Sequence, residues 1–355
     1  MVLSIHNVCN YLIENGLVSL KSVVEGDLMV RDASSRNTNF LINQFAEGGK
    51  KLLVKQPDID DEKYVQDMKI EADIYEIITK NSAFSKIRKY VPKIHHYDSQ
   101  NYILVMEQLS GVCRVFDYQY HGPNYPDKVI VQTMATILAG FHSIPFNKIK
   151  NIKPTFPWFL EVADNNYYKK VKKDDKKAYK ILKPFFENPE VMQFVKDAKA
   201  MWDSSHFIHL DTRLTNWLIP YSHKAGNKNP IWLIDFELAG MGDAAWDIGF
   251  LIGEFIYFDT YIQTNKINIS PNEHYLTVAD TVKCLWSKYT KIRAVDGAFK
   301  EKVVRYTAIK IFLIIYEEVV DEDDVTLSDL IRKLTELFFD MINNTEKYLK
   351  TLFGK

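Results

Sequence analysis

The stretch His209-Leu-Asp-Thr-Arg-Leu-Thr-Asn216 runs into the apolar Trp-Leu-Ile-Pro-Tyr221, and a second apolar run, Ile231-Trp-Leu-Ile-Asp-Phe236, begins ten positions after Tyr221. The segment between them, Ser-His-Lys-Ala-Gly-Asn-Lys-Asn-Pro, is rich in turn-forming residues. Two strand-length apolar runs joined by such a turn predict a β-hairpin over residues 216–236. The hairpin would return Asp235 towards Asn216.

Three oxygen-bearing side chains, Asp211, Asn216 and Asp235, would then gather at one end of the strand pair. Mg²⁺ prefers one or two carboxylate or amide oxygens, with phosphates and waters completing its octahedron. We therefore expect Asn216 and Asp235 to be metal ligands. Asp211 would remain free to accept a proton from an attacking hydroxyl group.

These two motifs, His209 to Asn216 and Ile234 to Glu237, resemble the catalytic and metal-binding loops of the aminoglycoside phosphotransferase/choline kinase family, relatives of the protein kinases. The run from Asp235 to Asp247 also resembles the family's "DFE…GD…D" stretch. Asp247 falls where the family has a structural aspartate that orients the catalytic loop. The resemblance implies a phosphotransferase that uses ATP and Mg²⁺.

Upstream of these motifs, residues 1–109 have the pattern of strands interrupted by one helix. Strand-length apolar runs occupy residues 39–45, 51–56 and 102–109, and apolar residues recur at intervals of three and four between Asp61 and Asn81. This pattern predicts a compact α+β unit that would form the N-terminal nucleotide-binding lobe.

From about Asn124 the pattern becomes helical, with predicted helices over residues 127–143, 302–318 and 326–350, the last capped by Thr326 or Ser328. We therefore expect an α+β, bilobal, protein-kinase-like fold, with a β-rich N-lobe and a mainly helical C-lobe. The predicted boundaries are residues 1–109 for the N-lobe, 110–125 for the hinge and 126–355 for the C-lobe. Residues 154–203 would form an insert beside the acceptor site.

The resemblance also assigns residues of the N-lobe to the nucleotide. Kinase chemistry needs a strand lysine on the α- and β-phosphates, held by a glutamate from a helix, and Lys55 and Glu71 lie at suitable positions. Met106 would lie beside the adenine, and the backbone of Glu107 to Leu109 would hydrogen-bond to it. Arg213, two residues after Asp211, could contact the γ-phosphate.

Two positions depart from the family pattern. The loop between the first two strands usually contains glycine, whereas here it reads Val-Arg-Asp-Ala-Ser-Ser-Arg-Asn-Thr-Asn-Phe. Ser34, Ser35, Arg36 and Asn37 would offer hydroxyls, backbone N–H groups and a cation to the phosphates instead. Where the family often has His-Gly-Asp, this chain has a leucine, Leu210, which fits provided that its backbone φ is ordinary.

Composition excludes several classes of protein. The chain has 355 residues and a formal net charge of −1, so it has no basic excess to hold nucleic acid. No apolar stretch approaches a membrane span. The cysteines number only three and are far apart in the sequence, so they form no disulfide framework, which suggests a reduced, cytoplasmic compartment. Only 14 glycines are present, about 4% against an ordinary 7% or so.

Two charged segments give conflicting indications about the acceptor. Residues 169–180 carry seven lysines and two aspartates, which in the cleft would favour an anionic or peptide acceptor. Residues 317–324 contain six acids in eight positions, which would favour a cationic one. We expect the acceptor to be a hydroxyl of a small molecule. The alternatives are a Ser/Thr side chain of a peptide, or a nucleotide-binding pseudokinase that regulates a partner.

Overall fold

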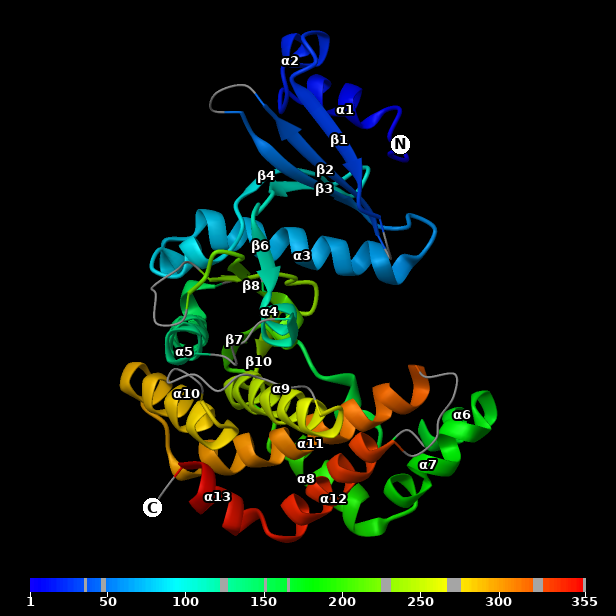
Figure 1. Ribbon diagram of the computed structural model, residues 1–355, viewed down its shortest axis with the longest axis vertical. Coiled ribbons are helices and arrows are strands. Elements are labelled where there is room, and N and C mark those ends of the chain that lie inside the picture. The colour runs from blue at the N-terminus through cyan, green and yellow to red at the C-terminus, as the bar shows by residue number, and fades with distance from the viewer. Residues whose placement is uncertain are drawn as a thin grey trace. The chain divides into compact units, whose positions relative to one another are not determined.

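Figure 1 shows the computed structural model of the chain, which describes residues 1–34, 37–45, 49–121, 127–149, 152–164, 167–224, 231–266, 276–321 and 328–353. The chain folds into two compact units. Unit 1 comprises residues 1–113, 218–222 and 230–239, and unit 2 comprises residues 114–217, 223–229 and 240–355.

Unit 1 is built on an antiparallel five-stranded sheet with the strand order β1-β2-β3-β5-β4. Its strands are β1 (Leu28–Asp32), β2 (Thr38–Gln44), β3 (Lys51–Gln56), β4 (Ile94–Asp98) and β5 (Ile103–Glu107). The three apolar runs predicted as strands therefore correspond to β2, β3 and β5. A β-bulge between Ile94 and His96 interrupts the pairing of β4 with β5.

The two faces of this sheet have different partners because successive side chains of a strand point to opposite faces. Phe40, Ile42, Leu52 and Val54 are buried in a cluster with residues of the N-terminal segment. That segment forms α1 (Val8–Glu14) and α2 (Leu20–Val24), two short helices that the periodicity of the sequence did not reveal. Lys55 alternates with these core residues and lies on the opposite face.

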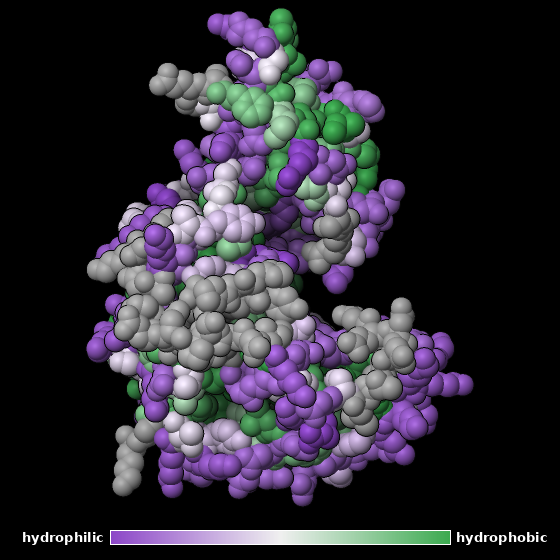
Figure 2. Space-filling view, in the orientation of Figure 1, coloured by the Kyte–Doolittle hydropathy of each residue, from purple (hydrophilic) through white to green (hydrophobic). Residues whose placement is uncertain are grey.

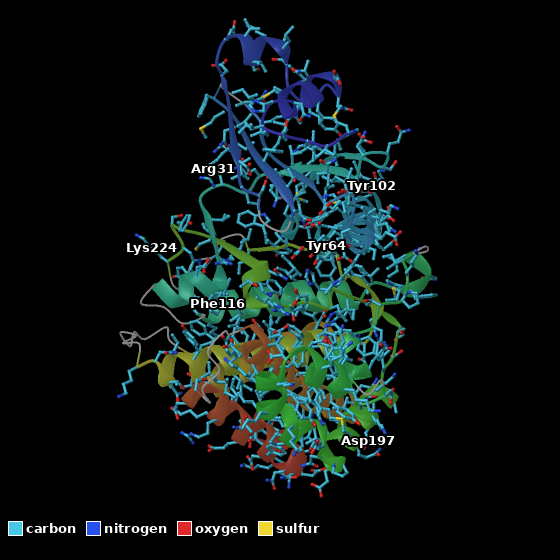
Figure 3. The ribbon with its side chains drawn as sticks, turned by 90° about the vertical axis from the view of Figure 1, so that its right-hand side faces the viewer. Arg31, Tyr64, Tyr102, Phe116, Asp197 and Lys224 are labelled. Carbon is cyan, nitrogen blue, oxygen red and sulfur yellow. The ribbon has the colours of Figure 1, made fainter. Side chains whose placement is uncertain are left out.

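The helix of unit 1 is α3 (Glu62–Lys80), as the apolar spacing predicted. Asp61 caps its first turn by accepting hydrogen bonds from the N–H groups of Lys63 and Tyr64, and Figure 3 labels Tyr64 at this end. The buried stripe of α3 includes Met68, Tyr75 and one acid, Glu71, which is only 2% exposed. A buried carboxylate needs a cationic or hydrogen-bonding partner, so Glu71 must have one close by.

The predicted hairpin is confirmed. A small three-stranded sheet has the order β6-β8-β9, in which β8 (Trp217–Pro220) and β9 (Trp232–Leu233) are neighbours and β6 is Val112–Arg114. The β9 strand leads directly to Asp235.

Unit 2 is mainly helical. Its helices are α4 (Val115–His121), α5 (Lys128–His142), α6 (Tyr167–Asp174), α7 (Lys176–Phe186), α8 (Pro189–Ala200), α9 (Ala244–Thr264), α10 (Val278–Ile292), α11 (Gly297–Asp321), α12 (Asp329–Asn343) and α13 (Thr345–Phe353), and it has two short antiparallel strands, β7 (His206–Ile208) and β10 (Gly240–Gly242). The single long helix predicted over residues 326–350 is wrong, since α12 ends at a C-cap, Asn344, and α13 begins after it. Ser328 caps α12, as expected.

Close packing of α9 against α11 is built on two glycines one helical turn apart. A Cβ on Gly249 would lie 2.8 Å from the carbonyl oxygen of Val303, and one on Gly253 would lie 2.6 Å from Cγ of Lys310. Each distance is shorter than carbon contacts allow, so a larger residue would push α11 away. The contact brings the C-terminal half of α11, which carries Lys310, against α9.

Several predicted features lie outside the described residues: Ser35 and Arg36, the turn at Glu47-Gly48, Thr326, and the acids from Glu322 to Asp324. Among the described helices, none combines the length and the apolar character that crossing a membrane requires.

Gln56 joins the N-terminal segment to the sheet, and its replacement tests this contact. The Gln56 side chain is 1% exposed, accepts a hydrogen bond from Leu3 N–H, and donates to the carbonyl oxygens of Met1 and Asn101. Gln56→Leu leaves these backbone groups unpaired, so the free energy of unfolding should fall by about 2 kcal/mol in a urea titration. Gln66→Leu, on the exposed side of α3, should change it by less than about 0.5 kcal/mol. Equal stability of the two variants would contradict this role of Gln56.

Candidate active site

A cavity of about 520 Å³ opens on the face of the unit 1 sheet that carries Lys55. Its polar wall includes Asn37, Asn39, Lys55, Glu71, Glu107, Gln108, Asp235 and Glu237, and its apolar wall includes Leu41, Leu53, Met106, Leu109, Leu218 and Ile234. Ligand cavities of enzymes usually have this size and this mixture of apolar surface with a few convergent polar groups. The sequence-predicted residues Met106, Glu107 and Leu109 all line it.

Lys55 and Glu71 form an ion pair inside this cavity. The Nζ atom of Lys55 lies 2.6 Å from Oε2 and 2.8 Å from Oε1 of Glu71, and the two side chains are 13% and 2% exposed. Burial lowers the pKa of Lys55, but the carboxylates of Glu71 and Asp235 outweigh this effect and raise the pKa above its ordinary value. Lys55 is therefore a fixed positive charge at neutral pH.

Asp235 lines the same cavity, and its backbone has an unusual conformation. Its φ is +69°, in the left-handed region that residues other than glycine seldom adopt. The neighbouring Phe236 is fully buried and packs edge-on against Tyr75 of α3, with ring centroids 5.3 Å apart. Packing of Phe236 thus fixes the turn that holds the Asp235 carboxylate in the cavity.

Two buried amide oxygens in the same cavity were not predicted from the sequence. Oδ1 of Asn39 and Oε1 of Gln108 have no hydrogen-bond partner, although both residues line the cavity. Unpaired buried acceptors cost free energy, and a polar ligand with donor groups would satisfy them. Asn39 is paired with Lys55 in the ladder between β2 and β3, a relation that only the register of the strands reveals.

Ser34 supports the glycine-free loop between β1 and β2. Its N–H donates to Oδ1 of Asp32 at 2.8 Å, and its hydroxyl accepts from the N–H of Asn39 at 3.1 Å. Ser34 is not among the residues that line the cavity, whereas Ala33, Asn37 and Asn39 are. Its contact with a phosphate stays a prediction.

The second group of predicted residues lies in unit 2, on the loop that follows β7. Nδ2 of Asn216 donates to the carbonyl oxygen of Asp211 at 3.0 Å and to Oδ2 at 3.1 Å. Nε of Arg213 lies 2.9 Å from Oδ1 of Asp211. The structure thus brings Asp211, Arg213 and Asn216 together, and each carboxylate oxygen of Asp211 accepts one hydrogen bond.

Asp247 holds the backbone of the loop from His209 to Asn216, the candidate catalytic loop. Its fully buried carboxylate accepts hydrogen bonds from the N–H groups of His209 and Leu210, at 2.8 and 2.9 Å. The φ of Leu210 is +71°, so the condition of an ordinary φ at this leucine is not met. A left-handed residue other than glycine costs about 1 kcal/mol or more. The bonds to Asp247, and that from the indole of Trp246 to the carbonyl oxygen of Leu210, hold the loop in this conformation.

Further buried groups complete the support of the loop. Nε2 of His142 lies 3.1 Å from Oδ2 of Asp247, and burial lowers the pKa of this histidine, so the imidazole is neutral at neutral pH. Glu254 of α9 accepts a hydrogen bond from Leu214 N–H at 3.0 Å and pairs with Lys310 of α11 at 2.9 Å. The candidate catalytic loop is therefore fixed at two points by carboxylates of α9.

A cavity of about 360 Å³ in unit 2 is lined by Phe116, Arg213, Thr215, Glu254, Tyr257, Lys310, Ile314, Glu317 and Glu318. Figure 3 labels Phe116, which belongs to α4. Three carboxylates and two cations line this cavity, and Glu317 and Glu318 open the acidic segment singled out in the sequence. None of the lysines between residues 169 and 180 is among its lining residues.

The two residues predicted to hold a metal belong to different units, Asn216 to unit 2 and Asp235 to unit 1. Across the described residues, no group of three or more His, Cys, Asp and Glu side chains is arranged to hold a metal ion. A site with one carboxylate, one amide oxygen and phosphate ligands suits Mg²⁺, which seldom takes an all-protein cage. The magnesium site stays a prediction.

Solved structures with this fold include several kinases. The choline kinase from Streptococcus pneumoniae is 16% identical, with a TM-score of 0.56 over 92% of this chain and 99% of that one. The choline kinase from Cryptosporidium parvum is 14% identical, with a TM-score of 0.59 over 97% of both chains. An aminoglycoside phosphotransferase is 12% identical, with a TM-score of 0.52 over 96% and 99%. The fold is thus α+β and protein-kinase-like, as predicted.

The sequence model of the phosphotransferase enzyme family matches residues 30–265, about two thirds of the chain. The chain belongs to this family, and it is a phosphotransferase. No curated protein matches it.

Asp247→Asn tests the support of the catalytic loop. An amide offers one acceptor oxygen and places an NH₂ group against backbone N–H donors, so at least one bond to His209 or Leu210 is lost. The free energy of unfolding should fall by about 2 kcal/mol or more in a urea titration. Asp197→Asn, on the exposed face of α8, is the matched control and should change it by less than about 0.5 kcal/mol. A stable Asp247→Asn variant would show that the loop keeps its conformation without this carboxylate.

Proposed function

We propose that the chain transfers the γ-phosphate of ATP to a hydroxyl group of a small molecule, with Mg²⁺. The observation that carries the proposal is the buried Lys55–Glu71 pair, 2.6 Å from Nζ to Oε2, inside a cavity of nucleotide size. A lysine held by a glutamate beside an aspartate is the arrangement that protein kinases use at the phosphates of ATP.

The cavity of unit 1 would take the nucleotide. Met106 and Leu109 supply apolar surface for the adenine, and the unpaired oxygens of Asn39 and Gln108 would accept hydrogen bonds from donors of the nucleoside. Lys55 would neutralise phosphate oxygens. One structural neighbour of this chain was solved as a complex with AMP, which supports an adenine nucleotide.

Asp235 and the amide oxygen of Asn216 would be the protein ligands of Mg²⁺, which would neutralise phosphate charge. The Nδ2 atom of Asn216 donates hydrogen bonds to Asp211, so the side-chain oxygen of Asn216 is the atom left for a cation. Both residues are oxygen donors of the type that Mg²⁺ prefers.

The proposed chemistry is a direct displacement with Asp211 as the base. The carboxylate of Asp211 orients the acceptor hydroxyl and takes its proton while the hydroxyl oxygen forms a bond to the γ-phosphorus. The bond from this phosphorus to the β–γ bridging oxygen breaks, and ADP leaves. Asn216 donates to Oδ2 of Asp211, and Arg213 donates to Oδ1 until an acceptor takes its place, so both oxygens have lone pairs for the hydroxyl proton. Positioning and charge stabilisation would supply most of the rate enhancement.

A cationic acceptor, such as an amino alcohol, is favoured by the cavity of unit 2. Three carboxylates line it, those of Glu254, Glu317 and Glu318, whereas only two cationic side chains do. The lysine-rich segment does not contribute to the lining. The lysines instead lie on the exposed face of α6 and α7, where Figure 2 shows hydrophilic side chains. Structural neighbours include kinases named for choline and for aminopropanol, both amino alcohols.

Asp211→Asn tests the proposed base. Loss of the proton acceptor should lower the rate of phosphomonoester formation by about 10²- to 10⁴-fold, measured by mass spectrometry with ATP, Mg²⁺ and a mixture of amino alcohols. ATP affinity should change little, because Lys55, Glu71 and Asp235 keep their contacts in unit 1. Asp197→Asn again serves as the control. An undiminished rate in Asp211→Asn would contradict the assignment.

A further inference from the structure

Arg213 connects two carboxylates of unit 2 that come from distant parts of the chain. Its Nε lies 2.9 Å from Oδ1 of Asp211, and its Nη2 lies 2.6 Å from Oε1 of Glu317 on α11. Burial lowers the pKa of Arg213, but the two carboxylates outweigh it and raise the pKa above its ordinary value. The guanidinium is thus the shared counter-ion of Asp211 and Glu317.

This ion pair is accessible, in contrast to the other ion pair of the same cavity. The side chains of Arg213 and Glu317 are 38% and 28% exposed, whereas those of Lys310 and Glu254 are 1% and 9% exposed. An exposed ion pair contributes little net stability and exchanges its partners readily, while a buried pair is costly to break. Arg213 is therefore the cation of the cavity that an incoming ligand can replace.

We propose that Arg213 is a tethered competitor of the acceptor: without a ligand, its guanidinium takes the place between Asp211 and Glu317 that the cationic group of the acceptor occupies when bound. The inference rests on the proposed function, because it takes Asp211 as the group that receives the acceptor hydroxyl. It makes Glu317 a specificity-determining residue and gives Arg213 a second role, as a tethered competitor of the acceptor.

The contacts of Arg213 are those that a cationic alcohol needs. Such a molecule must place its hydroxyl on Asp211 and its positive charge on a second carboxylate, and the guanidinium spans Asp211 and Glu317 in this way. Phe116 and Tyr257 line the same cavity, and aromatic rings attract cations that lie over their faces. A neutral alcohol could replace only the contact with Asp211.

Competition for Glu317 has a consequence for selectivity. A ligand without positive charge would have to leave the guanidinium in place, and a cation without a hydroxyl would gain Glu317 but not the proton acceptor. The tethered guanidinium therefore favours compact molecules that carry both groups. It also prevents the repulsion that Asp211 and Glu317 would exert on each other in an empty cavity.

The test removes the guanidinium and supplies cations from solution. In Arg213→Ala, methylguanidinium should bind about fivefold or more tightly than to the parent protein by isothermal titration calorimetry, and millimolar amounts should raise the melting temperature of the variant. 2-Aminoethanol should behave in the same way, and ethylene glycol, which lacks the charge, should have no effect. Arg213→Gln, which keeps most of the side-chain volume, is measured in parallel in case the alanine variant does not fold.

Two further variants decide the outcome. Arg305→Ala removes a matched arginine, which pairs with Glu301 on the same helix at 3.0 Å, and it should acquire no affinity for methylguanidinium. Adding Glu317→Gln to either Arg213 variant should abolish the increase in affinity for methylguanidinium. Equal binding of methylguanidinium by the parent and both Arg213 variants, or a gain that survives Glu317→Gln, would overturn the proposal.

Failure of this inference can be told from failure of the proposed function. The binding experiment needs neither ATP nor turnover, so a cation site that depends on Glu317 would appear even if no phosphate were transferred. Conversely, phosphate transfer to an amino alcohol by a protein whose Arg213 variants gain no cation affinity would leave the function intact and refute the role of Glu317.

Discussion

The carboxylate of Asp247 accepts hydrogen bonds from two consecutive backbone N–H groups, those of His209 and Leu210, while buried on α9. These bonds hold Leu210 at a φ of +71° and thereby fix the start of the loop that carries Asp211. Because Asp211, Arg213 and Asn216 all follow within six residues, their mutual contacts depend on the conformation set at this point. The neutral imidazole of His142 supports the same carboxylate from α5. A strained leucine persists here because its surroundings determine its backbone conformation.

Glycine, which is scarce in this chain, is used where helices must approach closely. Gly249 and Gly253 allow α11 to pack against α9, and this contact places Lys310 beside Glu254. Glu317, two turns further along α11, reaches Arg213. In the described part of the glycine-free segment between β1 and β2, Ser34 is hydrogen-bonded to Asp32 and Asn39. The low glycine content is thus compatible with a phosphotransferase. The packing of α9 against α11, which supports the loop, needs glycine at two positions only, and both positions have it.

Much of the fold could be predicted because the signals were local. The periodicity of α3, the runs of β2, β3 and β5, and the hairpin of β8 and β9 follow from neighbouring residues. The pairing of Lys55 with Glu71 could be predicted from the spacing of a kinase motif, but α1 and α2 are too short to give a periodic signal. The pairing of Asn39 with Lys55 depends on strand register, and the contact of Arg213 with Glu317 joins residues 104 positions apart. The break between α12 and α13 at Asn344 was missed because the apolar pattern continues across it.

We propose that the loop held by Asp247 belongs to a kinase whose acceptor is a cationic alcohol. The most direct measurement is ³¹P NMR of the full chain with ATP, Mg²⁺ and two matched panels, one of amino alcohols and one of uncharged polyols of similar size. Such a kinase should give a new phosphomonoester signal, together with ADP, in the amino alcohol panel and little or none with the polyols. Transfer to the polyols alone, or an unchanged ATP spectrum in both panels, would contradict it.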